Sequence, residues 1–308
     1  MGSMHTGLEE EKGGFKHLAR FYADRVKGGV ALIVTGGISP NRAGVTIFGG
    51  ARLANIFHVA KHRVITNAVK SEGGNIVMQI LHAGRYAYTP FNVAPSAIKA
   101  PINRFKPRAL SSRGVERTIK DFVKTAVLAK RAGYSGVEVM GSEGYLINEF
   151  IASETNHRTD KWGGSFENRI QFPKDIVRRI REAVGPDFLI MYRLSMLDLV
   201  VGGSSWEEVE HLAKDIEIAG ADVINTGIGW HEARIPTIAT MVPRGGFAFV
   251  TKRLMGKVGI PLITTNRFND PVDCEKALKD GCSDMISMAR PFLADPNLMK
   301  KAQEGESE

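Results

Sequence analysis

One short stretch of the chain crowds polar and aromatic side chains at the end of an apolar run. Residues 136–150 read GVEVMGSEGYLINEF, in which Val137 and Val139 are β-branched and the run breaks at Gly141 and Gly144. The polar and aromatic residues that follow are Glu143, Tyr145, Asn148 and Glu149. In α/β proteins, a strand that ends in such a loop is a typical place for catalytic groups. The alternative is an ordinary strand-to-helix connection whose tyrosine packs on a helix.

Three arginines follow other apolar runs and predict a site for an anion. Arg193 ends the run in LIMYRLSM (189–196), whereas Arg267 and Arg290 follow the last two runs, in TTNRF and SMARP. A guanidinium fixed at a strand end needs an anionic or electron-rich partner. Barrels often bind phosphate after their last two strands. The alternatives are an ion pair between Arg193 and a nearby carboxylate, and two ordinary surface loops.

The elements that must position these residues follow a repeated unit. A helical stretch ends at glycine, and after one or two residues a short, nearly continuous apolar run begins, as expected of parallel strands covered on both faces. The helices between them are amphipathic, as in 111–132, and Ser205 with Glu208 predicts a capping box. The junctions lie at 26–35, 70–80, 130–139, 183–192, 217–226, 257–265 and 279–288.

Seven such strands, with MGSMHT at the start of the chain as a possible eighth, predict a (β/α)8 TIM barrel formed by one domain over 1–308. An open doubly wound sheet is disfavoured because no G-x-G-x-x-G turn follows a strand. The expected strand ends therefore mark the site. They are Ser3, Met4 and His5; Gly36 and Gly37; Gln79 and His82; 141–145; Arg193; 226–231; Asn266 and Arg267; and Ala289 and Arg290.

Composition narrows the class of protein. The net charge of +8 suits an anionic, phosphate-bearing ligand, and the basic residues are spread along the chain rather than gathered into a nucleic-acid-binding arm. No run of about twenty apolar residues is present for a membrane helix, and the start of the chain shows no secretory signal. The two cysteines, Cys274 and Cys282, form neither a metal motif nor a disulfide framework. We expect a cytoplasmic protein with free thiols and no metal site.

Eight segments along the chain carry a resemblance to a known family. They are GSMHTGLEE (2–10), QILHAGRY (79–86), APSAI (94–98), GVEVMGSEGYLINEF (136–150), NHRTDKWGGSFENR (156–169), YRLSM (192–196), INTGIGWHEARIPT (224–237) and SMARPFLADP (287–296). The chain thereby resembles the flavin barrel of the Old Yellow Enzyme superfamily (the NADH:flavin oxidoreductase/NADH oxidase family). GSEGYLINEF together with GWHEARIPT is most similar to the N-terminal FMN domain of bacterial-type 2,4-dienoyl-CoA reductase.

The resemblance implies FMN as the cofactor and a set of contacts to it. Gly37 and Gln79 are expected to meet the ring, and Arg193 to lie near N1 and the C2 carbonyl. A fixed guanidinium there would favour the reduced, negatively charged ring. The other implied contacts are Ser3, Met4 and His5 from the first strand, and Arg267, Ala289 and Arg290 at the ribityl phosphate.

The reaction implied by the resemblance is reduction of a conjugated C=C bond, with hydride from reduced FMN and a proton from Tyr145 assisted by His231. A phenol with a pKa near 10 is protonated at neutral pH and can act as such a donor. The implied substrate is a 2,4-dienoyl-CoA thioester of an auxiliary step in fatty-acid β-oxidation, and NADPH would supply electrons only indirectly. The implied substrate contacts are His231, Glu232, Ala233 and Arg234. The oligomeric state is left open.

Several positions depart from the family pattern. Met140 and Glu143 stand where other Old Yellow Enzymes have two substrate-binding His or Asn residues, which argues against a generic enone reductase. Glu154 replaces an expected basic residue. The resemblance begins inside the first strand and stops before the iron–sulfur motif and the FAD and NADPH domains of a full-length relative. We therefore expect either a fragment of a longer gene product or a shortened barrel. The alternatives are an FMN-binding barrel without independent turnover or a generic enone reductase.

A phosphate-substrate barrel such as an aldolase is a weaker alternative. It would need a lysine at a strand end to form a Schiff base, and no strand carries a convincing one.

Overall fold

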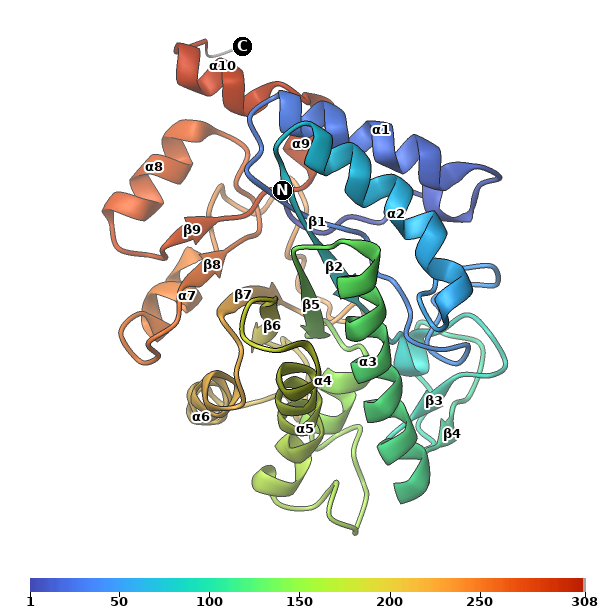
Figure 1. Ribbon diagram of the computed structural model, residues 1–308. Helices are drawn as coiled ribbons and strands as arrows, with labels where there is room; N and C mark the ends of the chain where they lie inside the picture. The colour runs from blue at the N-terminus through green and yellow to red at the C-terminus, as the bar shows by residue number, and fades with distance from the viewer. Residues whose placement is uncertain (307–308) are drawn as a thin grey trace.

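Seven parallel strands form the centre of the molecule, and helices surround them (Figure 1). The structure is a computed structural model that describes residues 1–306. The strands are β1 (Leu32–Val34), β2 (Asn75–Ile80), β5 (Gly136–Gly141), β6 (Leu189–Leu197), β7 (Val223–Ile228), β8 (Leu262–Thr264) and β9 (Met285–Ile286), hydrogen-bonded in that order. Each lies at one of the seven predicted junctions, so the alternation of helices and parallel strands is confirmed.

The first residues of the chain lie between the two edges of this sheet. The backbone N–H of Val34 donates to the carbonyl of Met1 at 2.9 Å, and the N–H of Gly2 donates to the carbonyl of Met288 at 2.7 Å. A side chain at Gly2 would meet Ser287 Oγ at 2.5 Å, so glycine is needed for this close approach. The segment predicted as an eighth strand therefore joins β1 to the loop after β9, although its pairing is too short to count as a regular strand.

The helices follow the strands in the expected alternation. They are α1 (Gly14–Lys27), α2 (Ile56–Ser71), α3 (Ser112–Ala132), α4 (Leu146–Ile151), α5 (Phe166–Val184), α6 (Trp206–Ile218), α7 (Ala248–Leu254), α8 (Pro271–Lys279), α9 (Arg290–Ala294) and α10 (Leu298–Glu304). The other regular elements of residues 1–306 are two 3₁₀ turns and a two-stranded ladder. The turns are η1 (Leu8–Glu10) and η2 (Gly84–Tyr86), and the ladder consists of β3 (Val93–Ala94) and β4 (Arg108–Ala109).

Local sequence signals fix where the helices begin and end. The Ser205 side chain accepts from the N–H of Glu208, whose carboxylate accepts in return from the N–H of Ser205, which confirms the predicted capping box at α6. The α3 helix begins after Ser111, whose hydroxyl accepts from the N–H of Gly114. It ends at Gly133, which has a φ of 90° and provides the left-handed cap. None of the helices in residues 1–306 is both long and apolar enough to cross a membrane.

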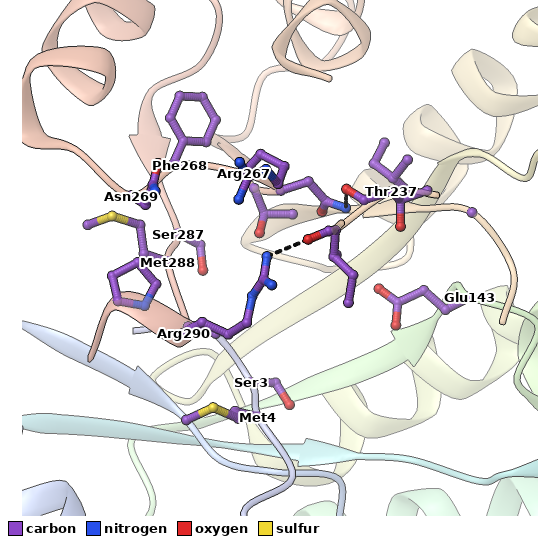
Figure 2. Close-up of a pocket in the computed structure, with 18 of the residues that line it drawn as sticks. Ser3, Met4, Glu143, Thr237, Arg267, Phe268, Asn269, Ser287, Met288 and Arg290 are labelled. Atoms are coloured by element: carbon purple, nitrogen blue, oxygen red, sulfur yellow. Dashed lines mark hydrogen bonds between the residues drawn. The ribbon is translucent and has the colours of Figure 1, made fainter. Parts of the chain in front are cut away.

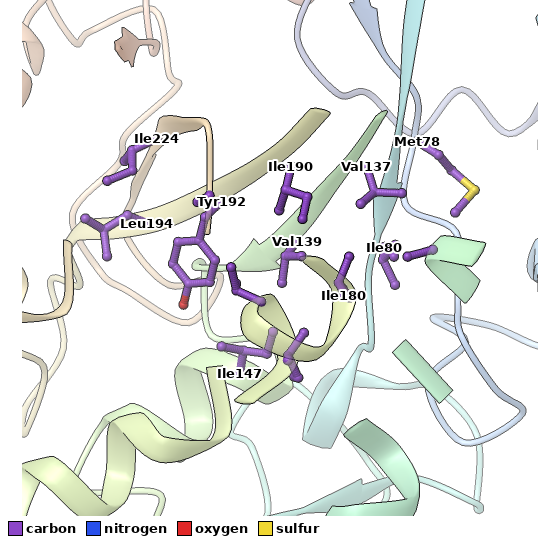
Figure 3. Packing of buried hydrophobic residues seen from close by; sticks show 14 of the residues in the cluster. Met78, Ile80, Val137, Val139, Ile147, Ile180, Ile190, Tyr192, Leu194 and Ile224 are labelled. Carbon is purple, nitrogen blue, oxygen red and sulfur yellow. The ribbon is translucent and has the colours of Figure 1, made fainter. Parts of the chain in front are cut away.

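The side chains of each strand alternate between two environments. On β6, Ile190, Tyr192 and Leu194 pack outward in the main core, together with Ile180 of α5 and Ile147 of α4 (Figure 3). The intervening Met191 belongs to a separate inner cluster whose other buried members are Val34, Val77, Val223 and Ile263. Since strand side chains alternate with a period of two, the inner face of β6 also carries Arg193.

The same rule places other polar side chains inside the barrel. Gln79 lies two residues after Val77, and Asn225 two residues after Val223, so both follow the inner apolar cluster toward the carboxyl ends of the strands. Glu138 lies on β5 between Val137 and Val139, which pack outward (Figure 3). The interior thus has an apolar floor and a polar layer above it.

Candidate active site

Tyr145 and His231 meet at the carboxyl ends of β5 and β7. The Tyr145 phenol oxygen and His231 Nε2 are 2.8 Å apart, within hydrogen-bond distance. Tyr145 is the N-cap residue of α4, and the N–H of His231 donates to the carbonyl of Glu143 at 3.4 Å, which ties the two loops together. Burial raises the pKa of Tyr145, the Glu143 carboxylate raises it further, and Arg193 lowers it in part. The phenol is therefore protonated at neutral pH and can donate.

Gly144 makes the close packing behind this pair possible. Its φ is +80°, and a Cβ there would lie 2.5 Å from the Tyr86 hydroxyl and 2.7 Å from Trp230 Cε3. Tyr86 makes edge-to-face contacts with both Tyr145 and His231, with ring centroids 6.1 and 5.7 Å apart. Only glycine fits both the backbone conformation and the space, so the aromatic wall depends on it.

The loop that carries His231 is anchored by its neighbour Glu232. One Glu232 oxygen accepts from Arg85 Nη2 at 2.6 Å, and the other accepts from the Tyr86 hydroxyl at 2.9 Å. Arg85 is itself only 4% exposed, so this ion pair is largely shielded from water. Glu232 was predicted as a substrate contact; here its carboxylate holds the loop against η2.

A cavity of about 830 Å³ opens at the strand ends, and His231 is part of its lining. Figure 2 shows this cavity. Its size falls in the range of about 300–1,000 Å³ typical of ligand sites. Arg290 and Glu143 face it from opposite sides in Figure 2. Its lining includes eight residues predicted for cofactor or substrate: Ser3, Met4, Arg193, His231, Ala233, Arg267, Ala289 and Arg290.

Arg193 lies at the inner end of this cavity and has a carboxylate partner. Its Nη2 donates to Glu143 Oε1 at 2.6 Å, which matches the alternative considered from the sequence. Its Nε is buried and has no hydrogen-bond partner. Burial lowers the pKa of Arg193, but the carboxylates of Glu143 and Glu138 outweigh this effect and raise it. At least this Nε donor thus remains unpaired among residues 1–306.

Arg267 and Arg290 have no carboxylate partner among residues 1–306. Arg267 Nε donates to the carbonyl of Val242 at 2.9 Å, and Arg290 Nη2 donates to the carbonyl of Ile238 at 2.8 Å (Figure 2). Asn266 and Arg267 adopt φ angles of 69° and 65°, a conformation that non-glycine residues rarely adopt outside functional turns. Two uncompensated guanidiniums at one end of the cavity suit a phosphate group.

Four of the residues predicted as catalytic or as cofactor contacts lie outside the lining of this cavity. Gln79 is buried below it and donates from Nε2 to Glu138 Oε2 at 2.7 Å. His5 is exposed, with Nε2 3.4 Å from Glu10. At Gly37 a Cβ would meet Leu81 Cδ1 at 2.7 Å, so packing within the protein already requires this glycine. Tyr145 reaches the cavity through its partner His231.

A second cavity, of about 600 Å³, adjoins the first and shares Trp230, Ala233 and Ile235 with it. The remaining members of its lining include the predicted substrate residues Glu232 and Arg234. They also include Glu154, which replaces the basic residue expected from the family pattern. Leu199, Val200 and Val201 give it an apolar side. The shared residues Trp230 and Ala233 flank His231 in the chain, so the two cavities meet at the loop that carries it.

Sequence reasoning missed two features of this site and did not name the carboxylate partner of Arg193. The two features are the contacts of Glu138 inside the barrel and the lining of the first cavity by 235–238. Glu138 carried a signal, because a lone carboxylate interrupts an otherwise apolar strand. The 235–238 segment carried none, since its placement depends on the long loop after β7.

Comparison with known proteins assigns the family. The model of the "NADH:flavin oxidoreductase / NADH oxidase family" matches residues 1–308. The chain belongs to this family. A protein of Desulforamulus reducens named "Metal reductase" is 36% identical over 100% of the chain and 47% of its own length. The structure of a 2-naphthoyl-CoA reductase in complex with 2-naphthoyl-CoA has a TM-score of 0.90 and 32% identity over 95% of the chain and 47% of its own.

The Old Yellow Enzyme homologue from Zymomonas mobilis matches with a TM-score of 0.80 and 28% identity, over 94% of the chain and 82% of its own length. The chain spans about half the length of the first curated relatives it matches. These matches confirm the predicted barrel and the predicted family, whose cofactor is FMN.

The site of this family member fits FMN. The free Nε of Arg193 offers a donor to the polar edge of the ring, and Arg267 and Arg290 offer two charges to a single phosphate. The volume of the first cavity, which Ser3 and Met4 help to line, agrees with a cofactor of this size. The individual contacts remain predictions.

Proposed function

We propose that the protein reduces the conjugated C=C bond of an acyl thioester of the 2,4-dienoyl-CoA class, with FMN as cofactor. The observation that carries this proposal is the 2.8 Å contact between Tyr145 and His231 at the mouth of the cofactor cavity. FMN, when bound and reduced, supplies the hydride. The protein must supply one proton, so that the substrate gains two hydrogens and two electrons in all.

The Tyr145 phenol is the group that holds this proton. Its raised pKa keeps it protonated until a substrate carbon or oxygen becomes basic. His231 is exposed and bonded to the phenol oxygen, so it can return a proton to Tyr145 from solvent. The Arg85–Glu232 ion pair holds the His231 loop in place, which keeps the two groups within hydrogen-bond distance.

The second cavity supports the choice of a thioester substrate. Its apolar side at 199–201 and the exposed Arg234 suit a chain with an anionic tail. The similar 2-naphthoyl-CoA reductase takes a conjugated aromatic thioester. Glu154 at the rim of the same cavity places a carboxylate near the tail, so the acyl-CoA contact there differs from that of the family branch.

A substrate panel tests the proposal. The FMN-loaded chain is reduced with dithionite without oxygen and mixed with 2,4-hexadienoyl-CoA, hexanoyl-CoA or 2-cyclohexenone. We expect the dienoyl thioester to oxidise the flavin fastest, with a 3-enoyl- or 2-enoyl-CoA as the product. Faster reaction with 2-cyclohexenone would favour a generic enone reductase. Reaction with none of them would favour an FMN-binding barrel without turnover.

A further inference from the structure

A fully buried carboxylate lies inside the barrel beneath the cofactor cavity. Glu138, in the middle of β5, is 0% exposed. Its neighbours Val137 and Val139 pack outward against the helices (Figure 3), so its own side chain faces the barrel interior. Burying a carboxylate is costly unless it is well hydrogen-bonded, and an apolar residue would fit the strand pattern better. The position therefore calls for a specific reason.

The two oxygens of Glu138 bind two carboxamides from different strands. Gln79 Nε2 of β2 donates to one oxygen at 2.7 Å, and Asn225 Nδ2 of β7 donates to the other at 2.7 Å. β2 is the neighbour of β5, whereas β7 lies beyond β6, so the second bond crosses the barrel interior. One carboxylate thus fixes two amides: Gln79 pairs in register with Glu138 itself, and Asn225 pairs in register with Arg193.

This arrangement decides which end of each amide is turned toward Glu138. A carboxylate accepts hydrogen bonds and does not donate them, so both amides must present nitrogen to it and direct oxygen away. Asn225 Oδ1 is buried without a hydrogen-bond partner, and Gln79 Oε1 has no partner among residues 1–306. Buried acceptors are normally satisfied, so the unpaired Gln79 oxygen is available to a donor outside the protein.

Gln79 is the next-to-last residue of β2, so its carboxamide lies near the carboxyl end of the strand, the end at which the cofactor cavity opens. On the other side lies the inner apolar cluster, with Val77 and Val223 two residues before Gln79 and Asn225 on the same faces of their strands. That cluster offers no donor. The ring of a flavin carries one N–H in its pyrimidine part, between two carbonyl groups, and this N–H needs an acceptor.

We propose that Glu138 is a positioning residue, which orients the Gln79 carboxamide so that its oxygen accepts from the pyrimidine N–H of FMN. The inference rests on the FMN contact proposed for Gln79. It adds that Glu138 decides whether the oxygen or the nitrogen of the Gln79 amide faces FMN. Glu138 itself does not touch the cofactor. It disfavours the flipped orientation of the Gln79 carboxamide, in which the Gln79 NH₂ group would face the N–H of the flavin.

The test measures FMN affinity of the full chain by fluorescence titration of the apoprotein. Glu138→Gln keeps the shape but holds only one acceptor oxygen, so one of the two amides must turn or lose its bond. We expect FMN binding to weaken by about tenfold, the effect of one lost hydrogen bond. Asp175→Asn is the matched control, since Asp175 is a buried carboxylate on α5 that pairs with surface arginines. It should leave FMN affinity unchanged.

Two further measurements separate positioning from a general loss of stability. In a Gln79→Ala background, Glu138→Gln should weaken FMN binding no further, because the amide through which it acts is gone. The preference of the wild type for FMN over 3-methyl-FMN, which lacks the N–H, should shrink in Glu138→Gln by the same factor as the affinity.

An unchanged affinity in Glu138→Gln, or an equal loss with and without Gln79, would overturn the inference. If Glu138→Gln fails to fold, the double variant Gln79→Glu, Glu138→Gln decides. In it, the carboxylate at position 79 accepts from the amide nitrogen at position 138 and again presents an acceptor oxygen to FMN, and the amide oxygen at position 138 accepts from Asn225. This double variant should prefer FMN over 3-methyl-FMN as the wild type does, and equal binding of the two would count against the inference. A wild-type chain that binds no FMN would instead refute the proposed function.

Discussion

At the scale of single residues, Arg193 is the residue that we propose to tune the cofactor most directly. Its guanidinium is held by Glu143 and keeps one buried donor free. A carboxylate partner both fixes the side chain and reduces the positive charge that a bound ligand meets. We therefore expect a bound cofactor to interact mainly with the unpaired Nε of Arg193, in the orientation in which Glu143 holds the side chain.

Replacing this arginine should weaken the cofactor interaction. In Arg193→Met, we expect weaker FMN binding or a lower flavin reduction potential, by about 1–3 kcal/mol for one charged hydrogen bond. The Glu143 and Glu138 carboxylates would then face the ring without a counter-charge. Titration and a spectroscopic potential measurement check this. Arg178→Met, on the outer surface of α5, removes the same charge and is the control. Equal FMN affinities and flavin potentials in the two variants would place Arg193 away from the ring.

The sequence predicts these residues better than it predicts their contacts. Tyr145 and His231 could be assigned from the family resemblance, but nothing in their spacing of 86 positions shows that they touch. The partner of Arg193 was foreseen only as a nearby carboxylate. Glu138 stood out as a polar interruption of a strand, yet its partners on β2 and β7 depend on the closure of the barrel. Pair contacts of this kind come from tertiary structure.

At the scale of elements, the loop from β5 to α4 holds the site together. Gly141 ends the strand, Glu143 has a φ of 62°, and Gly144 lets the loop pass under Tyr86 and Trp230. The seven strands were predictable because glycine followed by an apolar run marks each helix-to-strand junction. The β3–β4 ladder was not, because two-residue strands in a long loop carry no periodicity.

This loop should tolerate no side chain at Gly144. Gly144→Ala combines a left-handed φ with contacts of 2.5 and 2.7 Å to Tyr86 and Trp230, so we expect a loss of about 2–4 kcal/mol in the free energy of unfolding. Gly164→Ala is the matched control: its φ is +81° with nothing within 4 Å, and it should cost only about 1 kcal/mol. Urea unfolding measures the free energy of unfolding of both variants. Equal losses would mean that Tyr86 and Trp230 can move to make room for a side chain at position 144.

At the scale of the whole molecule, the barrel closes around its own first residues and presents most of the proposed contacts at one end. Met1 and Gly2 join β1 to the loop after β9, which brings Ser3 and Met4 to the cofactor cavity beside Arg290 (Figure 2). The sequence predicted this end of the barrel from the strand ends alone. The second cavity and the long loop after β7 could not be predicted, because neither follows from a repeated pattern.

The most direct test of the account is the rate at which the reduced, FMN-loaded protein is reoxidised by a 2,4-dienoyl-CoA in a stopped-flow instrument. Tyr145→Phe should still bind FMN and accept electrons from dithionite, since the phenol is not needed for either. Its reoxidation by the dienoyl thioester should slow by about 10²–10⁴-fold, the loss typical of one general acid. His231→Ala should slow it similarly, and the double variant by less than the product. Reoxidation of Tyr145→Phe at the wild-type rate would contradict the account.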